Sequence, residues 1–182
     1  MRISLSVFTS KLYTVRMQTI PVANSVLWQA YRKKADADLT PIRVQKLMYF
    51  LHGWYTTIVG TPLLDEAFVR GKFGPVLPSL ERELQRYAGV PVDDYIRQLN
   101  PDTAEMVPFF VNEKHAPQFL EILLSVWSQY SALSTAQLST LSHAWDSPWA
   151  KTAAGQPISN ELIVEDFRRR AAESQERSAA RA

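Results

Sequence analysis

The side chains with which this chain could do chemistry are three histidines and its carboxylates. The histidines are His52, His115 and His143, and no two of them stand at a spacing that one helix or one ribbon would bring together. Metal sites need clustered donors, and the chain has no H-x-x-x-H motif and no cysteine. We therefore predict no metal site and no other cofactor.

His143 has the most interesting neighbourhood, because Asp146 follows it and tryptophans stand on either side of that acid. A histidine oriented by a carboxylate can act as a general base, so one hypothesis is a small hydrolase or transferase built around His143 and Asp146. A loop histidine beside an aspartate is more often structural, however. The chain also lacks the G-x-S-x-G and G-x-G-x-x-G motifs. No sequence feature favours catalysis, and we predict that the protein is not an enzyme.

The aromatic side chains indicate a different kind of chemistry, the recognition of another protein. Five Trp and eight Phe are more than a minimal core of this length needs, and Trp, Tyr and Arg are enriched at interface hot spots. For each residue alone a structural role has the greater weight, so the interface interpretation applies to the surface as a whole. The candidate partner-binding residues are Lys72, Phe73, Gly74, Pro75, Val76, His143, Trp145 and Trp149.

The spacing of apolar residues predicts a mainly α fold, a compact bundle of about six helices with a short two-stranded β-ribbon. The ribbon is expected to pair a strand within residues 66–73 with one at 106–111, across a long polar connection at 90–103. The Gly74-Pro75 corner is expected to end the first strand. The helices are expected over residues 21–35, 40–59, 78–88, 117–130, 134–143 and 159–170.

Several helix ends carry specific signals. Thr40 suits an N-cap with Pro41 at the first helical position, and Ser134 with Gln137 forms a capping-box pattern. Gly53 lies inside a helix, which predicts the close approach of another backbone. The segment 117–130 is apolar nearly all round, so we expect it to be the central buried helix.

Charge is unevenly distributed along the chain. Residues 1–16 carry three basic residues and no acid, and residues 168–182 carry five arginines against two glutamates, so each end contributes +3 to the net +2 and leaves −4 for residues 17–167. A protein that binds nucleic acid should concentrate Lys and Arg on its folded part, so this distribution argues against nucleic acid as a partner. We expect residues 1–16 to be a disordered arm or a misassigned start, 17–170 to form one domain, and 171–182 to be a flexible tail.

Three features that the sequence lacks bear on the location of the protein in the cell. No run of about 18 apolar residues is present to span a membrane, and the first residues do not form a signal peptide. A chain without cysteine is compatible with a reducing compartment, because it has no disulfide to lose there. We therefore expect a cytoplasmic protein with no membrane partner.

Three blocks of the sequence form a joint pattern. The first, L-T-x-x-x-x-Q-K-L-x-Y-F…G-W-Y, is matched by Leu39, Thr40, Gln45, Lys46, Leu47, Tyr49, Phe50, Gly53, Trp54 and Tyr55. The second is matched by Pro62, Leu63, Asp65, Glu66, Phe73, Gly74, Pro75, Val76, Pro78, Ser79 and Leu80. The third, which is weaker, is matched by Leu138, Ser139, Leu141, Ser142, His143, Pro148 and Trp149. Together the three blocks resemble the Panacea domain, the SocA-like antitoxin family often found in phage and mobile-element contexts. Phe73 departs from the family pattern, which usually has tyrosine there.

The resemblance implies an antitoxin, a non-catalytic partner that neutralises a toxin encoded nearby by direct binding. One branch of the family is similar to a proteolytic adaptor, which would add a AAA+ protease as a second partner. The resemblance does not identify the toxin. The alternative that we keep is a nucleic-acid-binding regulator with a winged-helix-like element, because helices with a short β-ribbon can resemble that fold.

Overall fold

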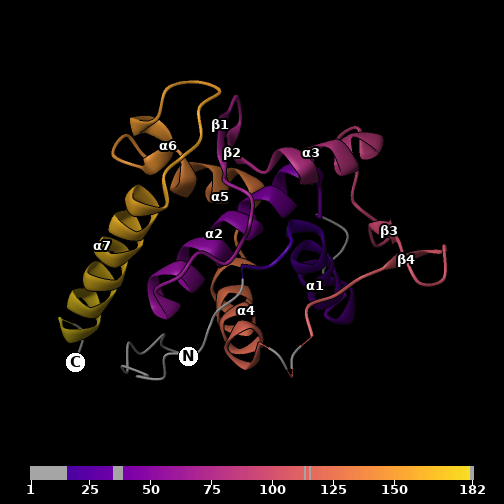
Figure 1. The fold of residues 1–182 in the computed structure, drawn as a ribbon. Helices are drawn as coiled ribbons and strands as arrows, with labels where there is room; N and C mark the ends of the chain where they lie inside the picture. Colours follow the sequence, from indigo (N-terminus) through magenta and orange to yellow (C-terminus); the bar gives the residue numbers. More distant parts are fainter. Residues whose placement is uncertain (1–15, 35–38, 113, 115, 181–182) are drawn as a thin grey trace.

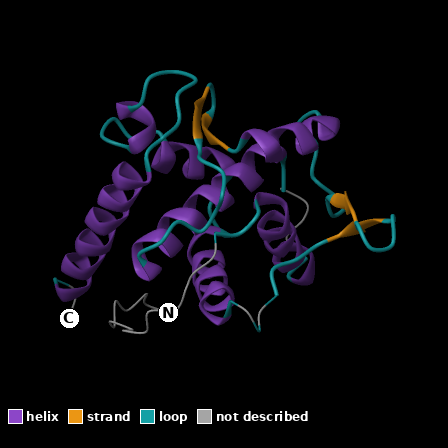
Figure 2. Ribbon diagram, in the orientation of Figure 1, coloured by secondary structure: helices purple, strands orange, loops and turns teal. Residues whose placement is uncertain are grey.

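The computed structural model describes residues 16–34, 39–112, 114 and 116–180, and within them the fold is mainly α, as predicted (Figures 1 and 2). The predicted arm at the N-terminus lies almost wholly outside these residues. The helices are α1 (Thr19–Arg32), α2 (Pro41–Val59), α3 (Pro78–Leu84), the short 3-10 helix η1 (Gln85–Tyr87), α4 (Pro117–Tyr130), α5 (Thr135–Ser142), α6 (Pro148–Lys151) and α7 (Asn160–Ala179). The strands are β1 (Val69–Gly71), β2 (Gly74–Val76), β3 (Arg97–Leu99) and β4 (Met106–Pro108).

The central helix is α2, and the prediction that residues 117–130 would take this place was wrong. Every residue from 43 to 57 is buried, because α1, α3, α4, α5, α7 and β2 all pack against α2 (Figure 1). Helix α4 lies on the outside of α2 and buries one face, while Leu120 and Leu124 on its other side stay partly exposed. Only some of the apolar side chains of α4 are therefore used in packing against the core.

Local signals set the ends of α2 as predicted. The side chain of Thr40 accepts a hydrogen bond from the backbone N–H of Arg43, and Pro41 is the first helical residue. Inside the helix, a Cβ on Gly53 would overlap the ring of Phe167. The close approach predicted at Gly53 is thus made by a side chain of α7, and not by a second backbone.

The described residues form two small antiparallel ribbons, and the pairing predicted from the sequence was wrong. Strand β1 pairs with β2, and β3 pairs with β4, so residues 66–73 and 106–111 do not meet as partners. The polar connection at 90–103 holds strand β3. Each strand finds its partner across a short turn, because closing a short loop costs less chain entropy than pairing across a long one.

Helix α7 begins as predicted, with the Ser159 side chain accepting a hydrogen bond from the N–H of Leu162. It was predicted to end at residue 170, but it continues to Ala179. The extension carries ion pairs one turn apart, Arg169–Glu173 and Glu173–Arg177, which favour a helix. The capping box of Ser134 and Gln137 at the start of α5 is confirmed.

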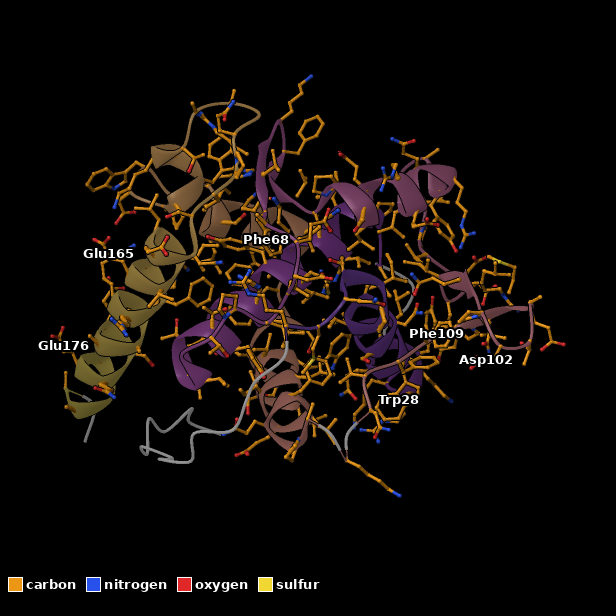
Figure 3. All side chains as sticks on the ribbon, viewed as in Figure 1. Trp28, Phe68, Asp102, Phe109, Glu165 and Glu176 are labelled. Atoms are coloured by element: carbon orange, nitrogen blue, oxygen red, sulfur yellow. The ribbon has the colours of Figure 1, made fainter. Side chains whose placement is uncertain are left out.

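The side chains place the core around α2. Phe68 lies in the middle of the molecule, whereas Glu165 and Glu176 point outward from α7 (Figure 3). Within residues 16–34, 39–112, 114 and 116–180, no helix is both long and apolar enough to cross a membrane.

Candidate functional site

The predicted partner-binding segment at residues 72–76 is the tip and second strand of the β1–β2 hairpin. Lys72 and Phe73 form its two-residue turn, and both are exposed, the Phe73 side chain by 58%. Gly74 and Pro75 are buried and belong to β2. The prediction that Gly74-Pro75 ends a strand was therefore wrong: Pro75 sits in the short β2, opposite Arg70.

Beneath the hairpin lie Lys46 of α2 and His143 at the end of α5. Gly74 has a φ of +112°, and a Cβ there would overlap both the Lys46 Nζ and the His143 Nε2 atoms, so only glycine fits. The Lys46 ammonium donates a hydrogen bond to the carbonyl of Phe73. This contact ties the hairpin turn to the central helix.

The Lys46 side chain is an unusual buried charge. It is 1% exposed, and within the described residues it forms no ion pair with a carboxylate. Burial disfavours the charged form and lowers the pKa of Lys46 to about 8. Burial also lowers the pKa of His143 and the positive charge of Lys46 lowers it further, while a hydrogen bond with the Phe73 backbone acts in the opposite direction.

Trp149 supports the hairpin from the side. Its indole Nε1 donates a hydrogen bond of 2.9 Å to the carbonyl of Gly71, and its ring lies 4.5 Å from the His143 ring, centroid to centroid. The guanidinium of Arg70 stacks over the same indole at 4.5 Å and also donates to the carbonyl of Thr152. His143 and Trp149 therefore hold the hairpin in place from within.

Two further polar residues position the corner and were not among the predicted site residues. The Gln45 amide bonds both backbone groups of Leu77, accepting from its N–H at 2.9 Å and donating to its carbonyl at 3.2 Å. The Glu66 carboxylate accepts from the N–H of Ser79 at 2.9 Å, next to the start of α3. Their signal in the sequence was the presence of polar residues inside otherwise apolar segments.

Trp145 differs from the other predicted residues, because it is 90% exposed in the loop between α5 and α6. The hydrolase hypothesis required His143 to act with Asp146. Instead, Asp146 pairs with Arg169 at 2.9 Å, and His143 packs on Trp149. Each member of the supposed pair has a different partner. Among the described residues, no three His, Asp or Glu side chains are grouped so as to hold a metal ion.

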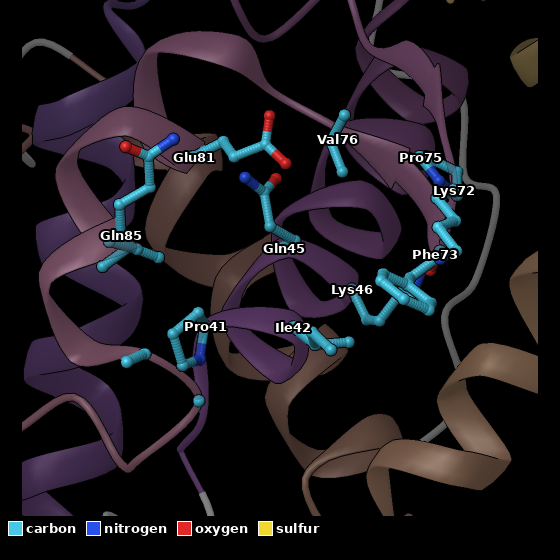
Figure 4. Close-up of a pocket in the computed structure, with 13 residues that line it drawn as sticks. Pro41, Ile42, Gln45, Lys46, Lys72, Phe73, Pro75, Val76, Glu81 and Gln85 are labelled. Carbon is cyan, nitrogen blue, oxygen red and sulfur yellow. The ribbon is translucent and has the colours of Figure 1, made fainter. Parts of the chain in front are cut away.

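A pocket of about 390 Å³, here called the corner groove, lies beside the hairpin (Figure 4). Its walls come from the first turns of α2, from the hairpin, and from the end of α3 with the residues that follow it. The lining is mostly apolar, and Ile42 and Phe73 are partly exposed beside it. The described lining residues are Pro41, Ile42, Gln45, Lys46, Lys72, Phe73, Pro75, Val76, Glu81, Leu84, Gln85, Ala88 and Gly89.

Comparison with known protein families matches residues 44–150 to the antitoxin SocA-like, Panacea domain family. This match spans more than half of the 182 residues. The chain belongs to this family. It is also 31% identical over 134 residues to Antitoxin SocA of Caulobacter vibrioides (strain NA1000 / CB15N), which is 74% of this chain and 69% of that relative. No solved structure gives a significant match.

The family segment of this Panacea domain contains the whole β1–β2 hairpin, with His143, Trp145 and Trp149. It also contains all of α2 except its first three residues. Helices α1 and α7 lie outside the matched segment but pack on α2, so they complete the core around it. The resemblance found in the sequence motifs is thereby confirmed.

Proposed function

We propose that this Panacea domain is the antitoxin of a type II toxin–antitoxin pair and neutralises a toxin encoded nearby by binding it directly. The observation that carries the proposal is membership of the SocA-like antitoxin family, together with 31% identity to a protein named Antitoxin SocA. Neutralisation by binding needs a complementary surface and no reacting group. In this proposal the protein acts in the cytoplasm as a partner and not as an enzyme.

The surface at the corner supports this proposal. Phe73 and Trp145 are large aromatic side chains exposed by 58% and 90%, and such residues are enriched where proteins bind each other. The hairpin that carries Phe73 is already held by Lys46 and Trp149. A surface ordered before binding loses less conformational entropy when the partner docks. We assign contact with the toxin to residues 72–76 and Trp145, and support of that surface to His143 and Trp149.

The charge distribution supports a protein partner over nucleic acid. Residues 17–167 carry 12 Lys and Arg against 16 Asp and Glu. Affinity for a duplex depends on neutralising phosphates with basic side chains, which this balance does not favour. The alternative of a nucleic-acid-binding regulator is thus the weaker reading.

The proposal is tested by co-expression with the adjacent open reading frame. We expect the neighbour to arrest growth alone, and this chain both to restore growth and to co-purify with the neighbour's product. Phe73→Ala and Trp145→Ala should each reduce rescue, whereas Leu99→Ala should not, although Leu99 is 61% exposed on the other ribbon. A neighbour that is neither toxic nor bound would contradict the proposal.

The same experiment separates simple binding from the adaptor version. If the chain delivers its toxin to a AAA+ protease, the neighbour's product should disappear on co-expression. It should then reappear in a strain that lacks the protease. Stable co-purification at undiminished toxin levels would instead indicate neutralisation by binding alone.

A further inference from the structure

The corner groove combines an apolar lining with a hydrophobic rim. Ile42 is 40% exposed and Phe73 58% exposed, and both line the groove together with Val76 and Leu84 (Figure 4). Its volume of about 390 Å³ lies in the lower part of the range found for protein pockets that bind small molecules. The groove is therefore shaped to receive one or two apolar side chains from a partner.

The charges at the groove are predominantly positive. Lys72 stands exposed at the hairpin turn with its ammonium 5.2 Å from the Phe73 ring centroid, and within the described residues it forms no ion pair. Lys46 adds a second positive charge, which is buried and has no acidic partner among the described residues. Glu81 is the acidic residue among the described lining residues, on α3. A partner with negative charge complements the hairpin side of this groove.

From this combination we propose that the corner groove binds a segment of the partner protein in which an apolar side chain stands next to a carboxylate. The apolar side chain enters between Ile42, Phe73 and Val76, and the carboxylate lies beside Lys72. This inference rests on the proposed function, because the partner is the toxin. It adds the location of the binding site and the chemistry of the segment that is recognised.

Two contributions would combine in such a contact. Burial of an apolar side chain against the groove lining removes apolar surface from water, which is the main favourable term in most protein association. A carboxylate beside Lys72 compensates a charge that has no ion-pair partner among the described residues. A basic segment would gain the first contribution but would meet repulsion from Lys72 and Lys46. The groove therefore discriminates by charge among segments of equal hydrophobicity.

The first test uses the full-length chain in complex with the product of the adjacent gene. Ile42→Glu places a carboxylate at the apolar rim, so we expect it to weaken binding by about tenfold or more, as does the loss of an interface hot spot. The matched control is Leu99→Glu on the β3–β4 ribbon, which should bind as the wild type does. If the wild type forms the complex and Ile42→Glu binds equally well, the groove assignment is wrong while the antitoxin function stands.

The second test needs no toxin. Two blocked peptides, acetyl-Glu-Leu-Phe-Glu-amide and acetyl-Lys-Leu-Phe-Lys-amide, are titrated into the isotope-labelled full-length chain and followed by the amide resonances. We expect the acidic peptide to shift the amides of Ile42, Phe73 and Gly74 and to bind several-fold more tightly than the basic peptide. Lys72→Gln should reduce this difference, with its thermal unfolding unchanged as the control for folding.

The peptide result decides the inference even if the adjacent gene encodes no toxin. Equal shifts with both peptides would overturn the charge preference. Shifts that map to the β3–β4 ribbon, or no shifts at all, would overturn the groove as the site. A groove that selects the acidic peptide, in a chain that does not rescue growth, would instead separate recognition from the antitoxin function.

Discussion

Lys46 lies in an environment very different from that of an ordinary surface lysine. Its side chain is 1% exposed, its ammonium bonds the Phe73 carbonyl, and burial lowers its pKa from 10.5 to about 8. In the unfolded chain the pKa returns to the ordinary value. Between pH 8 and pH 10.5 the unfolded chain therefore binds more protons at this position than the folded protein does.

The sign of the pH dependence follows from this proton difference. We expect Lys46 to make the free energy of unfolding rise from about pH 8 to 10.5, by at most about 1.4 kcal/mol per pH unit. Below pH 8 both states are protonated, and the unfavourable contribution of the buried charge is constant. Lys46→Met removes the titrating group. The measurement is urea unfolding of both proteins at several pH values from about 7 to 9.5.

The wild-type value minus the Lys46→Met value should increase with pH above about 8. Tyr31 and Tyr49, whose pKa values are raised by burial, act in the opposite direction when the unfolded tyrosines ionise near pH 10. Because both proteins contain these tyrosines, the difference removes their effect. A difference that stays flat over the whole range would show that Lys46 titrates alike in both states.

At the residue scale, the sequence did not single out the buried polar residues that position the corner, Gln45 and Lys46. Leu47, Phe50 and Trp54 stand at helical spacing along α2, and this periodicity by itself gives Gln45 and Lys46 no buried role. In the structure both are buried, because their polar groups bond the backbone of the hairpin and of Leu77. These hydrogen bonds join α2 to Phe73 and Leu77, which lie 27 and 32 residues further along the chain. Local periodicity alone could therefore not predict them.

At the element scale, helix starts followed from local chemistry and strand pairing did not. Thr40, Ser134 and Ser159 each bond an N–H of their own helix, an interaction within three residues. Strand choice depends on which segments meet, and the three-residue strands carry little pattern of their own. Two prolines inside strands, Pro75 and Pro108, further obscured the pattern. The predicted pairing of distant segments was wrong for this reason.

The β1–β2 hairpin is the element on which the proposed binding surface depends, so its anchoring can be tested. Trp149→Phe keeps a ring against His143 but removes the N–H that bonds the Gly71 carbonyl. We expect a loss of about 1 kcal/mol in unfolding free energy, the usual contribution of one such hydrogen bond. Amide exchange in the hairpin should become faster, because the turn loses one of its attachments.

The control for this variant is Trp145→Phe, which should change neither stability nor exchange, since Trp145 is 90% exposed. Hydrogen exchange followed by mass spectrometry over residues 69–76 measures the effect directly. Rescue of growth in the co-expression assay should also weaken for Trp149→Phe if an ordered hairpin contacts the toxin. Unchanged exchange in the hairpin would show that Lys46 and Arg70 hold it without Trp149.

At the scale of the whole molecule, the core extends beyond the segment matched by the family. Helix α7 lies outside residues 44–150, yet its Phe167 packs against Gly53 and stacks edge-on with Trp54 at 5.2 Å between ring centroids. Asp166 of the same helix is 5% exposed and forms ion pairs with Arg169 and Arg170, one turn further along α7. Beyond residue 172 the described side chains are mostly exposed.

This distribution predicts how much of the chain the function needs. A chain of residues 1–172 keeps Ile163, Asp166 and Phe167 and loses exposed ion pairs such as Arg169–Glu173, worth a few tenths of a kcal/mol each. We expect its unfolding free energy to fall by no more than about 1 kcal/mol, and its rescue of growth to match the full-length chain. Urea unfolding and the co-expression assay measure the two quantities.

A chain that ends at residue 158 is the contrasting variant, because it removes α7 and uncovers Gly53 and Trp54. Loss of an entire core helix should prevent stable folding, so this variant should neither rescue growth nor co-purify. If the 1–172 chain folds but fails to rescue, determinants of rescue lie beyond residue 172 and the corner is not sufficient. The toxin level would then separate the two mechanisms. If the full-length chain lowers the toxin level and the 1–172 chain does not, the result favours delivery to a protease through the residues beyond 172 over neutralisation at the corner.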